Sequence, residues 1–395
     1  MQKSLALISL SAIFSGCAQH NSGSDGKEEW NARNNPQAFN VSSYNFDALP
    51  TEGMLPDSAF PWSDDYWPTY AGGISKRWQV APNSTNYKDF QYPFLSQSEV
   101  VNGSASVAIK QLSPAEKYDL LLARYDFPLA RNEREIQERS VNAISHQVPL
   151  WLGICHGWAP ATLMEPEPGQ VAEMVNPDGI KIPFYTSDIN ALMSKVYAEY
   201  IDTTPRGTSV SVGERCYDEI HEVQRDENGR VIMSNCRDTN PGSLHLVLAS
   251  WLGADNPEDR RGFVADITRA SEVWNQAIVG YKVLEAKVKP FRPDNDPFSE
   301  VRAPRTVNLV RVKTELSYVH EMAPHGMPML AKKEQYTRKL VLDYTLELNA
   351  RGDIIGGEWN GQNVPDFLWR MLSRPVPGPY LDYETVSGIL AESLN

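Results

Sequence analysis

The chain is poor in cysteine and in positive charge and lacks long apolar runs, and each shortage excludes a class of protein. Four cysteines among 395 residues are too few for a scaffold built on disulfides. A net charge of -13 argues against binding nucleic acid or anionic membranes, since both require clustered Lys and Arg. With 41% hydrophobic residues, the chain is still long enough to bury a large core.

The N-terminus predicts export from the cell. Lys3 supplies the positive region of a signal peptide over residues 1–16, and the apolar run that follows is too short to span a bilayer. Cys17 comes directly after Ser-Gly, as in a bacterial lipobox, which predicts lipidation of Cys17 and a Gram-negative envelope lipoprotein. Ordinary secretion is the alternative. The polar residues 17–45 predict a flexible, lipid-attached tether.

In an oxidising compartment the four cysteines divide into three roles. Cys17 would be lipidated, and Cys216 could form a disulfide with Cys236 that stabilises the fold by about 3 kcal/mol. Cys155 is then the odd thiol. An unpaired cysteine outside the cytoplasm calls for a chemical explanation, so we interpret Cys155 as a nucleophile.

The residues around Cys155 favour this interpretation. Gly157 and Pro160 lie where a helix would begin, because proline suits a first helical turn. Cys155 is therefore expected at a helix N-terminus, where the helix dipole favours the nucleophilic thiolate. The alternative is a buried structural cysteine.

The remaining sequence predicts an α+β fold, with helices preceding an antiparallel sheet. Residues 46–110 form an aromatic-rich arm, which is also a candidate pro-segment, and residues 111–395 form the main domain. Ser113 opens a helix through a capping box, the charged residues 131–139 favour a solvated helical face, and Asp188 is expected to cap another helix. Alternating side chains predict strands over residues 307–319 and 339–349, and Gly356-Gly357 indicates a turn.

A cysteine nucleophile needs a base and a group that orients the base. Among seven histidines, His245 is the candidate base, because residues 243–248 alternate as in a strand. His320 and His325 suggest a zinc protease motif, but Pro324 and the wrong spacing exclude it. Asp266 lies in an apolar strand, where a carboxylate is costly without a partner. Two antiparallel strands would bring it to His245 and complete a Cys-His-Asp triad.

Other candidates complete the predicted site. The backbone N–H of Cys155 and one side-chain donor would hold the oxyanion; Gln147 is the first candidate donor and Trp62 and Trp67 are further ones. Three tryptophans are expected either to pack in the core or to line the substrate cleft: Trp151, Trp158 and Trp274.

Two stretches resemble the transglutaminase elicitor family, whose members are secreted enzymes of oomycete plant pathogens and marine bacteria. Residues 153–161, Gly-Ile-Cys-His-Gly-Trp-Ala-Pro-Ala, are similar to the family's nucleophile motif. Residues 273–285, Val-Trp-Asn-Gln-Ala-Ile-Val-Gly-Tyr-Lys-Val-Leu-Glu, are similar to the surface peptide by which plants detect the family, Val-Trp-Asn-Gln-Pro-Val-Arg-Gly-Phe-Lys-Val-Tyr-Glu. The family's Pro-Val-Arg is replaced here, so recognition by plants is not implied. With three tryptophan-bearing segments, the resemblance extends over residues 50–395.

The resemblance implies a protein-glutamine γ-glutamyltransferase with a cysteine-protease-like core. Its partners would be a glutamine-bearing protein or peptide and a primary amine such as lysine, with no nucleic acid and with membrane contact through the lipid alone. An envelope thiol hydrolase, either a peptidase or a peptidoglycan amidase, is the alternative, and a non-enzymatic binding lipoprotein is the third reading. No cofactor is required and no metal ligands are assigned. Calcium binding is left open, because residues 294–300 form an acidic loop, although this loop lacks the glycine of an EF-hand.

Overall fold

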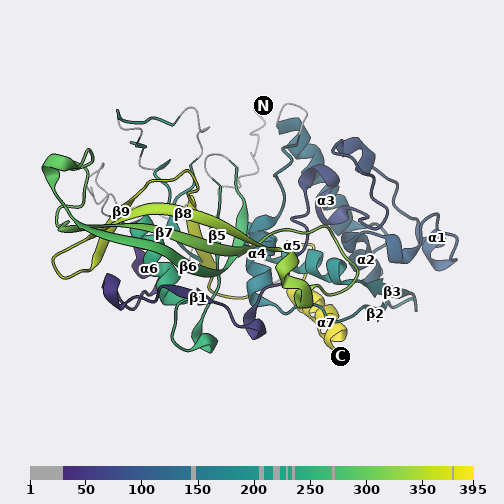
Figure 1. The fold of residues 1–395 in the computed structure, drawn as a ribbon. Coiled ribbons are helices and arrows are strands. Elements are labelled where there is room, and N and C mark those ends of the chain that lie inside the picture. The colour runs from purple at the N-terminus through teal and green to yellow at the C-terminus, as the bar shows by residue number, and fades with distance from the viewer. Residues whose placement is uncertain are drawn as a thin grey trace. The chain divides into compact units, whose positions relative to one another are not determined.

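The computed structural model describes residues 30–143, 148–203, 209–216, 223–227, 230–233, 236–268, 272–375 and 378–395. The chain divides into two compact units, which are described separately (Figure 1). Unit 1 comprises Met1–Phe60, Thr204–Val319 and Thr337–Ser373; unit 2 comprises Pro61–Thr203, His320–Tyr336 and Arg374–Asn395. Helices and an antiparallel sheet are both present, which confirms the predicted α+β class. Within the described ranges, no helix is both long enough and apolar enough to cross a membrane.

Unit 1 is built on an 8-stranded antiparallel sheet with the order β4-β10-β5-β6-β7-β8-β9, and β1 pairs with β6 off this path. In β8, burial alternates from Val341, which is 46% exposed, to the buried Tyr344, and from Thr345 onward both faces of the strand are buried. β7 and β8 thus confirm the two predicted strands. The bounds are β1 (Glu52–Met54), β4 (Ser209–Gly213), β5 (Phe263–Asp266), β6 (Asn275–Pro290), β7 (Asn308–Val319), β8 (Thr337–Leu348), β9 (Ile354–Trp359) and β10 (Phe367–Met371).

Helix α6 (Pro241–Trp251) packs against β8 and β9 of this sheet (Figure 1). The helix approaches closely because glycines face one another: a Cβ added to Gly242 would lie 2.6 Å from the carbonyl oxygen of Gly356. A Cβ on Gly357 would lie 3.1 Å from Pro241 Cγ. The turn predicted at Gly356-Gly357 is therefore wrong. The two glycines lie inside β9 and make room for the helix.

The described part of the predicted tether, from Trp30 onward, packs onto unit 1. Phe39 is fully buried, and its carbonyl accepts a hydrogen bond from the Trp251 indole at 2.7 Å. The carbonyl of Arg33 accepts from Gly213 N at 3.0 Å. The sequence missed this packing because single apolar residues in a polar segment carry no periodic signal. Residues 1–16 and Cys17, with their predicted cleavage and lipidation, lie outside the described residues.

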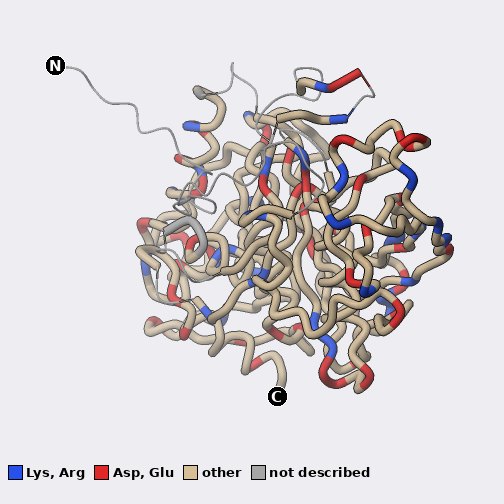
Figure 2. Tube along the Cα trace, turned by 90° about the vertical axis from the view of Figure 1, so that its left-hand side faces the viewer, with Lys and Arg blue, Asp and Glu red and all other residues tan. Residues whose placement is uncertain are grey.

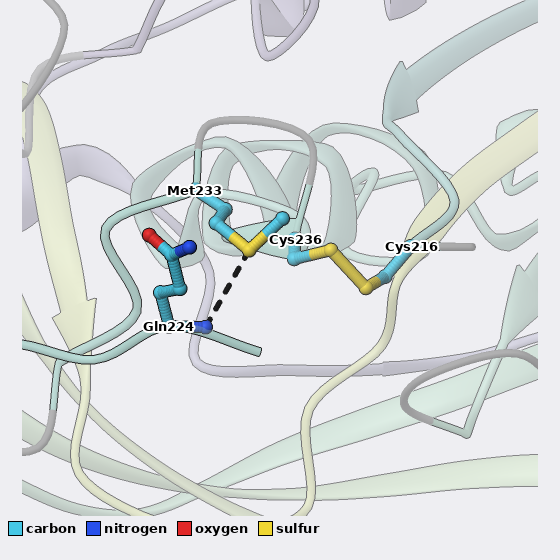
Figure 3. Close-up of a disulfide and its surroundings, with 4 residues drawn as sticks. All are labelled: Cys216, Gln224, Met233 and Cys236. Atoms are coloured by element: carbon cyan, nitrogen blue, oxygen red, sulfur yellow. Dashed lines mark hydrogen bonds between the residues drawn. A yellow bond between two sulfur atoms is a disulfide. The ribbon is translucent and has the colours of Figure 1, made fainter. Parts of the chain in front are cut away.

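The predicted disulfide between Cys216 and Cys236 is confirmed in unit 1 (Figure 3). Both cysteines are buried in a small apolar cluster with Val231, and Met233 packs against it. The Met233 sulfur also accepts a hydrogen bond from the backbone of Gln224 at 3.4 Å. The disulfide therefore joins β4's end to the segment that carries Met233 within this cluster.

Charged residues of both signs are interspersed along the described chain (Figure 2). On the sheet they pair across strands: Lys282 with Glu52 at 2.8 Å, and Lys339 with Glu315 at 2.7 Å. Exposed pairs of this kind contribute roughly 0–1 kcal/mol each. They favour solubility and strand register more than stability.

Unit 2 is mainly helical. Helix α2 begins with the predicted capping box, in which Ser113 Oγ accepts from Glu116 N and Glu116 Oε2 accepts from Ser113 N. Helix α3 covers the charged residues 131–139, as predicted, but the run is not solvated throughout, because Glu133 is buried and pairs with Lys195 at 2.7 Å. The bounds are α1 (Gln97–Val101), α2 (Pro114–Leu121), α3 (Pro128–Ala143), α4 (Cys155–Met164), α5 (Thr186–Thr203) and α7 (Tyr383–Leu394), with the hairpin β2 (Ala172–Val175) and β3 (Lys181–Phe184).

Asp188 is the third residue of α5 and not its N-cap, which corrects the prediction. Its carboxylate still serves the helix start, because it accepts a hydrogen bond from Tyr185 N at 2.8 Å. It also pairs with Lys117, and both side chains are fully buried. The second role explains why the aspartate lies inside the first turn, where it faces α2.

Candidate functional site

Cys155 is the first residue of α4, as predicted, and is 6% exposed. The N-cap residue is Ile154, whose apolar side chain cannot accept a capping hydrogen bond. The backbone carbonyl of Ile154 accepts hydrogen bonds from Gly157 N and Trp158 N, both at 2.9 Å. The backbone N–H groups and the positive end of the helix dipole at a helix N-terminus favour negative charge. Pro160 lies inside the helix and not at its start, which corrects the prediction. The helix tolerates it at the loss of one backbone hydrogen bond.

The loop before Cys155 is held by the aromatic arm. Ile154 N donates to the carbonyl of Tyr66, and Thr69 N donates to the carbonyl of Leu152, both at 2.8 Å. Gly153 is required between them, because an added Cβ would lie 2.5 Å from the Tyr66 carbonyl oxygen. The arm therefore fixes the backbone that presents Cys155.

Trp67 lies in this arm and combines two unusual features. It is a non-glycine residue with φ of 50°, a conformation that proteins keep mainly where surrounding structure enforces it. It is also fully buried, and among the described residues its indole Nε1 has no hydrogen-bond acceptor. Trp62 differs, because its Nε1 donates to the carbonyl of Glu165 at 2.9 Å. Buried donors without acceptors are rare in proteins, so Trp67 calls for a functional explanation.

His320, for which a zinc protease motif is excluded, and its neighbour Glu321 both lie in unit 2 with Cys155. His320 Nδ1 lies 3.0 Å from Glu321 Oε2, and the two side chains are 43% and 7% exposed. The only sequence signal was a histidine next to a glutamate at the end of a predicted strand. That signal says nothing of which part of the fold the pair joins.

His245 lies in α6 and not in a strand, which corrects the prediction. Its Nδ1 lies 2.8 Å from the hydroxyl of Tyr344, its ring stacks on Phe46, and burial lowers its pKa to about 4. The structure does not bring it to Asp266: across the described residues, Tyr344 is its hydrogen-bond partner. This environment is that of a neutral core histidine.

Asp266 ends β5, as predicted, and holds the turn into β6. Its Oδ1 accepts from Thr268 N at 3.1 Å and from Trp274 N at 2.9 Å. Asp366 lies beside it, since Asp366 N donates to the Asp266 carbonyl at 3.1 Å. Burial raises the pKa of Asp266 to about 6. Burial and the charges of Asp238 and Asp266 raise the pKa of Asp366 to about 11.

These carboxyl groups predict a stability that falls as pH rises. The folded pKa of Asp366, about 11, lies above its unfolded value of about 3.9, so within that window the folded state binds more protons. The upper limit is about 1.4 kcal/mol per pH unit for one proton. Asp366→Asn, which mimics the protonated acid, should flatten the decline in unfolding free energy from about pH 5 to pH 8. Denaturant titrations at several pH values test this, with the exposed Asp294→Asn as control; an equal slope in wild type and Asp366→Asn would refute it.

The three tryptophans predicted for the core or the substrate cleft differ in burial and in the unit to which they belong. Trp158 is fully buried in α4, whereas Trp151 and Trp274 are half-buried. Trp274 lies in unit 1, where its Nε1 donates to Glu272 at 3.1 Å. Gln147 lies outside the described residues and stays a prediction.

The acidic loop 294–300, the candidate site for calcium, forms an ion pair with an arginine. Arg302 pairs with Asp296 at 2.9 Å and with the buried Glu347 at 3.0 Å. In the part of the chain that the structure describes, no cluster of three His, Cys, Asp or Glu side chains could hold a metal ion. Asp296 thus has a structural partner in Arg302.

Comparison with known proteins decides the family. The family profile described as "Transglutaminase elicitor" matches residues 38–395. The chain belongs to the transglutaminase elicitor family. The resemblance drawn from the two sequence stretches is thereby confirmed.

The fold of this transglutaminase elicitor family member is similar to that in the crystal structure of the GP42 transglutaminase from Phytophthora sojae. The TM-score is 0.62 at 24% identity, over 90% of this chain and 95% of that chain. A comparison with curated proteins gave no match. In the family peptide, residues 275–281 are buried in β6, whereas Lys282 is exposed.

Proposed function

We propose that this family member is a protein-glutamine γ-glutamyltransferase that uses Cys155 as its nucleophile. The observation that carries the proposal is the Cys155 thiol, which makes no disulfide, at the start of α4 in a chain of this family. Cysteine is the most nucleophilic of the side chains used in covalent catalysis, and a helix N-terminus favours its thiolate.

The reaction proceeds in two acyl transfers. The Cys155 sulfur attacks the side-chain carbonyl carbon of a glutamine, the C–N bond breaks, and the nitrogen leaves as ammonia after it takes up a proton. A lysine amine then attacks the thioester, the C–S bond breaks, and an isopeptide bond forms. The amine loses a proton and the thiolate is restored, so no cofactor enters the balance.

Both transfers pass through an oxyanion, for which we propose two donors. The first is the backbone N–H of Cys155 at the helix start. The second is the indole N–H of Trp67, since it is buried, lacks an acceptor among the described residues, and belongs to the arm that holds the Cys155 loop. An N–H preorganised in this way is strongest in a dry site, where it has no competing partner.

Trp67→Phe should therefore lower kcat by about 10²–10³ and leave KM nearly unchanged. Trp62→Phe is the matched control, because its N–H is already used by Glu165. That variant should lower the unfolding free energy by about 1–3 kcal/mol, through the unpaired carbonyl, and keep kcat. Steady-state amine incorporation and denaturant unfolding separate the two effects. A Trp67→Phe enzyme with wild-type kcat would exclude the indole as donor.

The same nucleophile serves thiol peptidases and peptidoglycan amidases, so hydrolysis is the second candidate reaction. The deciding feature is access of water to the thioester. We propose that the half-buried Trp151 favours an amine over water. The enzyme would act on exported or envelope proteins, tethered through Cys17 if the predicted lipidation occurs.

The test is a product balance on the wild-type protein, freed of its N-terminal segment and with a titratable Cys155. A glutamine-containing peptide and a fluorescent primary amine are supplied, with and without calcium. The proposal expects one labelled peptide for each ammonia released. Peptide cleavage without incorporation of the amine would assign the enzyme to the thiol hydrolases. Complete inertness of the Cys155 thiol toward mild alkylation would favour the non-enzymatic reading.

A further inference from the structure

The loop that leads into Cys155 presents apolar side chains to solvent. Leu150 is 54% exposed, and three apolar residues after it are half-buried: Trp151, Leu152 and Ile154. We call these four residues the apolar rim. Single apolar residues on a protein surface are ordinary, whereas a contiguous apolar patch marks a place where another molecule binds. The rim ends at the residue before the nucleophile, so its binding partner would lie beside the Cys155 sulfur.

The conformation of this loop does not depend on the side chains of the rim. Backbone groups hold it: the carbonyl of Leu152 accepts from Thr69 N, and Ile154 N donates to the carbonyl of Tyr66, both at 2.8 Å. The hydroxyl of Tyr66 also donates to the carbonyl of Leu150 at 2.6 Å. Polar side chains at the exposed positions would keep all three bonds and would be better hydrated. The apolar character of the rim therefore calls for an explanation in binding.

Tyr66 connects the far end of the rim to the nucleophile in space. Its hydroxyl contacts the backbone of Leu150, the first residue of the rim. Burial is the main cause that raises the pKa of this hydroxyl, and the charge of Cys155 is one of the smaller causes. Leu150 and the Cys155 sulfur are therefore both close to one hydroxyl group. The rim and the sulfur belong to one surface.

The segments that form this surface offer little charge to a ligand. Residues 140–164 contain no Asp, Glu, Lys or Arg, although charged residues make up 22% of the chain. In the arm, Asp65 precedes Tyr66, but it is 6% exposed and pairs with Lys76 at 2.9 Å. A charged side chain laid on the rim would lose hydration without gaining an opposite charge from these segments. An apolar side chain would gain free energy from burial there.

We propose that the apolar rim is the subsite for the residues next to the reactive glutamine, and that it selects donor peptides in which those residues are apolar. This inference rests on the proposed function, because it names the class of glutamine donor. A glutamine side chain has only two methylene groups between its backbone and its carboxamide. When the carboxamide reaches the buried Cys155 sulfur, the donor's neighbouring side chains must therefore lie on the surface around it. The rim is the part of that surface that directly precedes Cys155.

Peptide binding to the Cys155→Ala protein tests the subsite without any chemistry. Four fluorescein-labelled peptides share the sequence Gly-Gly-X-Gln-X-Gly-Gly, in which X is leucine, serine, aspartate or lysine. Their dissociation constants are measured by fluorescence anisotropy. The leucine peptide should bind about five- to tenfold more tightly than the serine peptide, since its side chains are buried on the rim. The aspartate and lysine peptides should bind more weakly than the serine peptide.

Leu150→Asn and a matched control locate the preference on the rim. Leu150→Asn should reduce the preference for the leucine peptide over the serine peptide by about three- to fivefold. Leu284→Asn is the control, because Leu284 is the same residue type and is 50% exposed, but lies in β6 of unit 1. It should keep the full preference. Both positions are exposed, so both unfolding midpoints should stay close to that of the parent protein. With Cys155 intact, the same change should appear in kcat/KM for amine incorporation, through KM.

The outcomes separate the subsite from the proposed reaction. Equal binding of the four peptides, or an undiminished preference in Leu150→Asn, would overturn the subsite. Light scattering adds a further check: a dimer that Leu150→Asn dissociates, with the peptide preference unchanged, would assign the rim to a second copy of the chain in its place. If the preference is found and depends on Leu150, but the wild-type protein incorporates no amine, the subsite stands and the proposed transferase activity fails.

Discussion

Cys155→Ala is expected to incorporate no primary amine above the uncatalysed rate. Removal of the nucleophile from a comparable triad costs about 10⁶ in kcat, which places the residual activity below detection. The fold should be retained, because alanine suits a helix start and Cys155 makes no disulfide. Amine incorporation, alkylation stoichiometry and the unfolding midpoint together check this expectation.

The controls for Cys155→Ala separate loss of chemistry from loss of structure. Circular dichroism and the Cys216–Cys236 disulfide should be as in wild type, since the disulfide lies in unit 1. Thiol titration of the native protein should fall to zero in the same variant. Continued amine incorporation by a folded Cys155→Ala protein would show that another group is the nucleophile.

Gly157→Ala is expected to have the largest effect on stability. Gly157 lies where α4 packs against α5, and an added Cβ would lie 2.1 Å from the Ser194 carbonyl oxygen and 2.7 Å from Ala198 N. Backbone atoms cannot yield as a side chain does, so α4 would have to move off α5. We expect a loss of about 3 kcal/mol of unfolding free energy, at the upper end for overpacking. Because α4 begins at Cys155, activity should fall with it.

Gly388→Ala is the matched control for this substitution. Gly388 lies in α7, and its added Cβ would meet no atom within 4 Å. Alanine there should stabilise the helix by about 0.5–1 kcal/mol. Denaturant unfolding of the two variants should therefore give opposite signs. Equal stability of Gly157→Ala and wild type would mean that α4 and α5 are less tightly packed than the structure indicates.

Cys155 was predictable because its signals are local. A cysteine near helix-starting residues is expected at a helix N-terminus, and α4 does begin at Cys155. The alternating strands at 307–319 and 339–349 were predictable for the same reason, since one face of each is buried. The error at Pro160 is also local: proline is tolerated at the start of a helix more often than inside it.

His245 was misplaced because α6 is buried along most of its length, from Pro241 to Ala249. A helix that is apolar all round has no 3.6-residue period, so a chance alternation of two resembled a strand. The overlooked signal was Asn240 before Pro241, an N-cap followed by proline at the first helical position. Asn240 Oδ1 does accept from Gly242 N, at 2.9 Å.

His320 was beyond prediction from sequence for a different reason. Its place in the fold depends on a strand connection that belongs to unit 2, and on hydrogen bonds of residues 320 and 322 to Ser63 and Asp64, which are distant in sequence. Asp266 likewise sits in the predicted strand, but its neighbour Asp366 is supplied by the segment before β10. Local patterns place such residues on elements and do not reveal their tertiary neighbours.

The central claim is that glutamine is bound covalently to Cys155 during the reaction. Wild-type protein mixed with a glutamine peptide, without amine, and quenched in acid within one turnover should be analysed by intact mass and peptide mapping. The account predicts an adduct equal to the peptide less ammonia, carried by Cys155 and discharged when an amine is added. Turnover of the peptide with no adduct on Cys155, or an adduct on another residue, would contradict it.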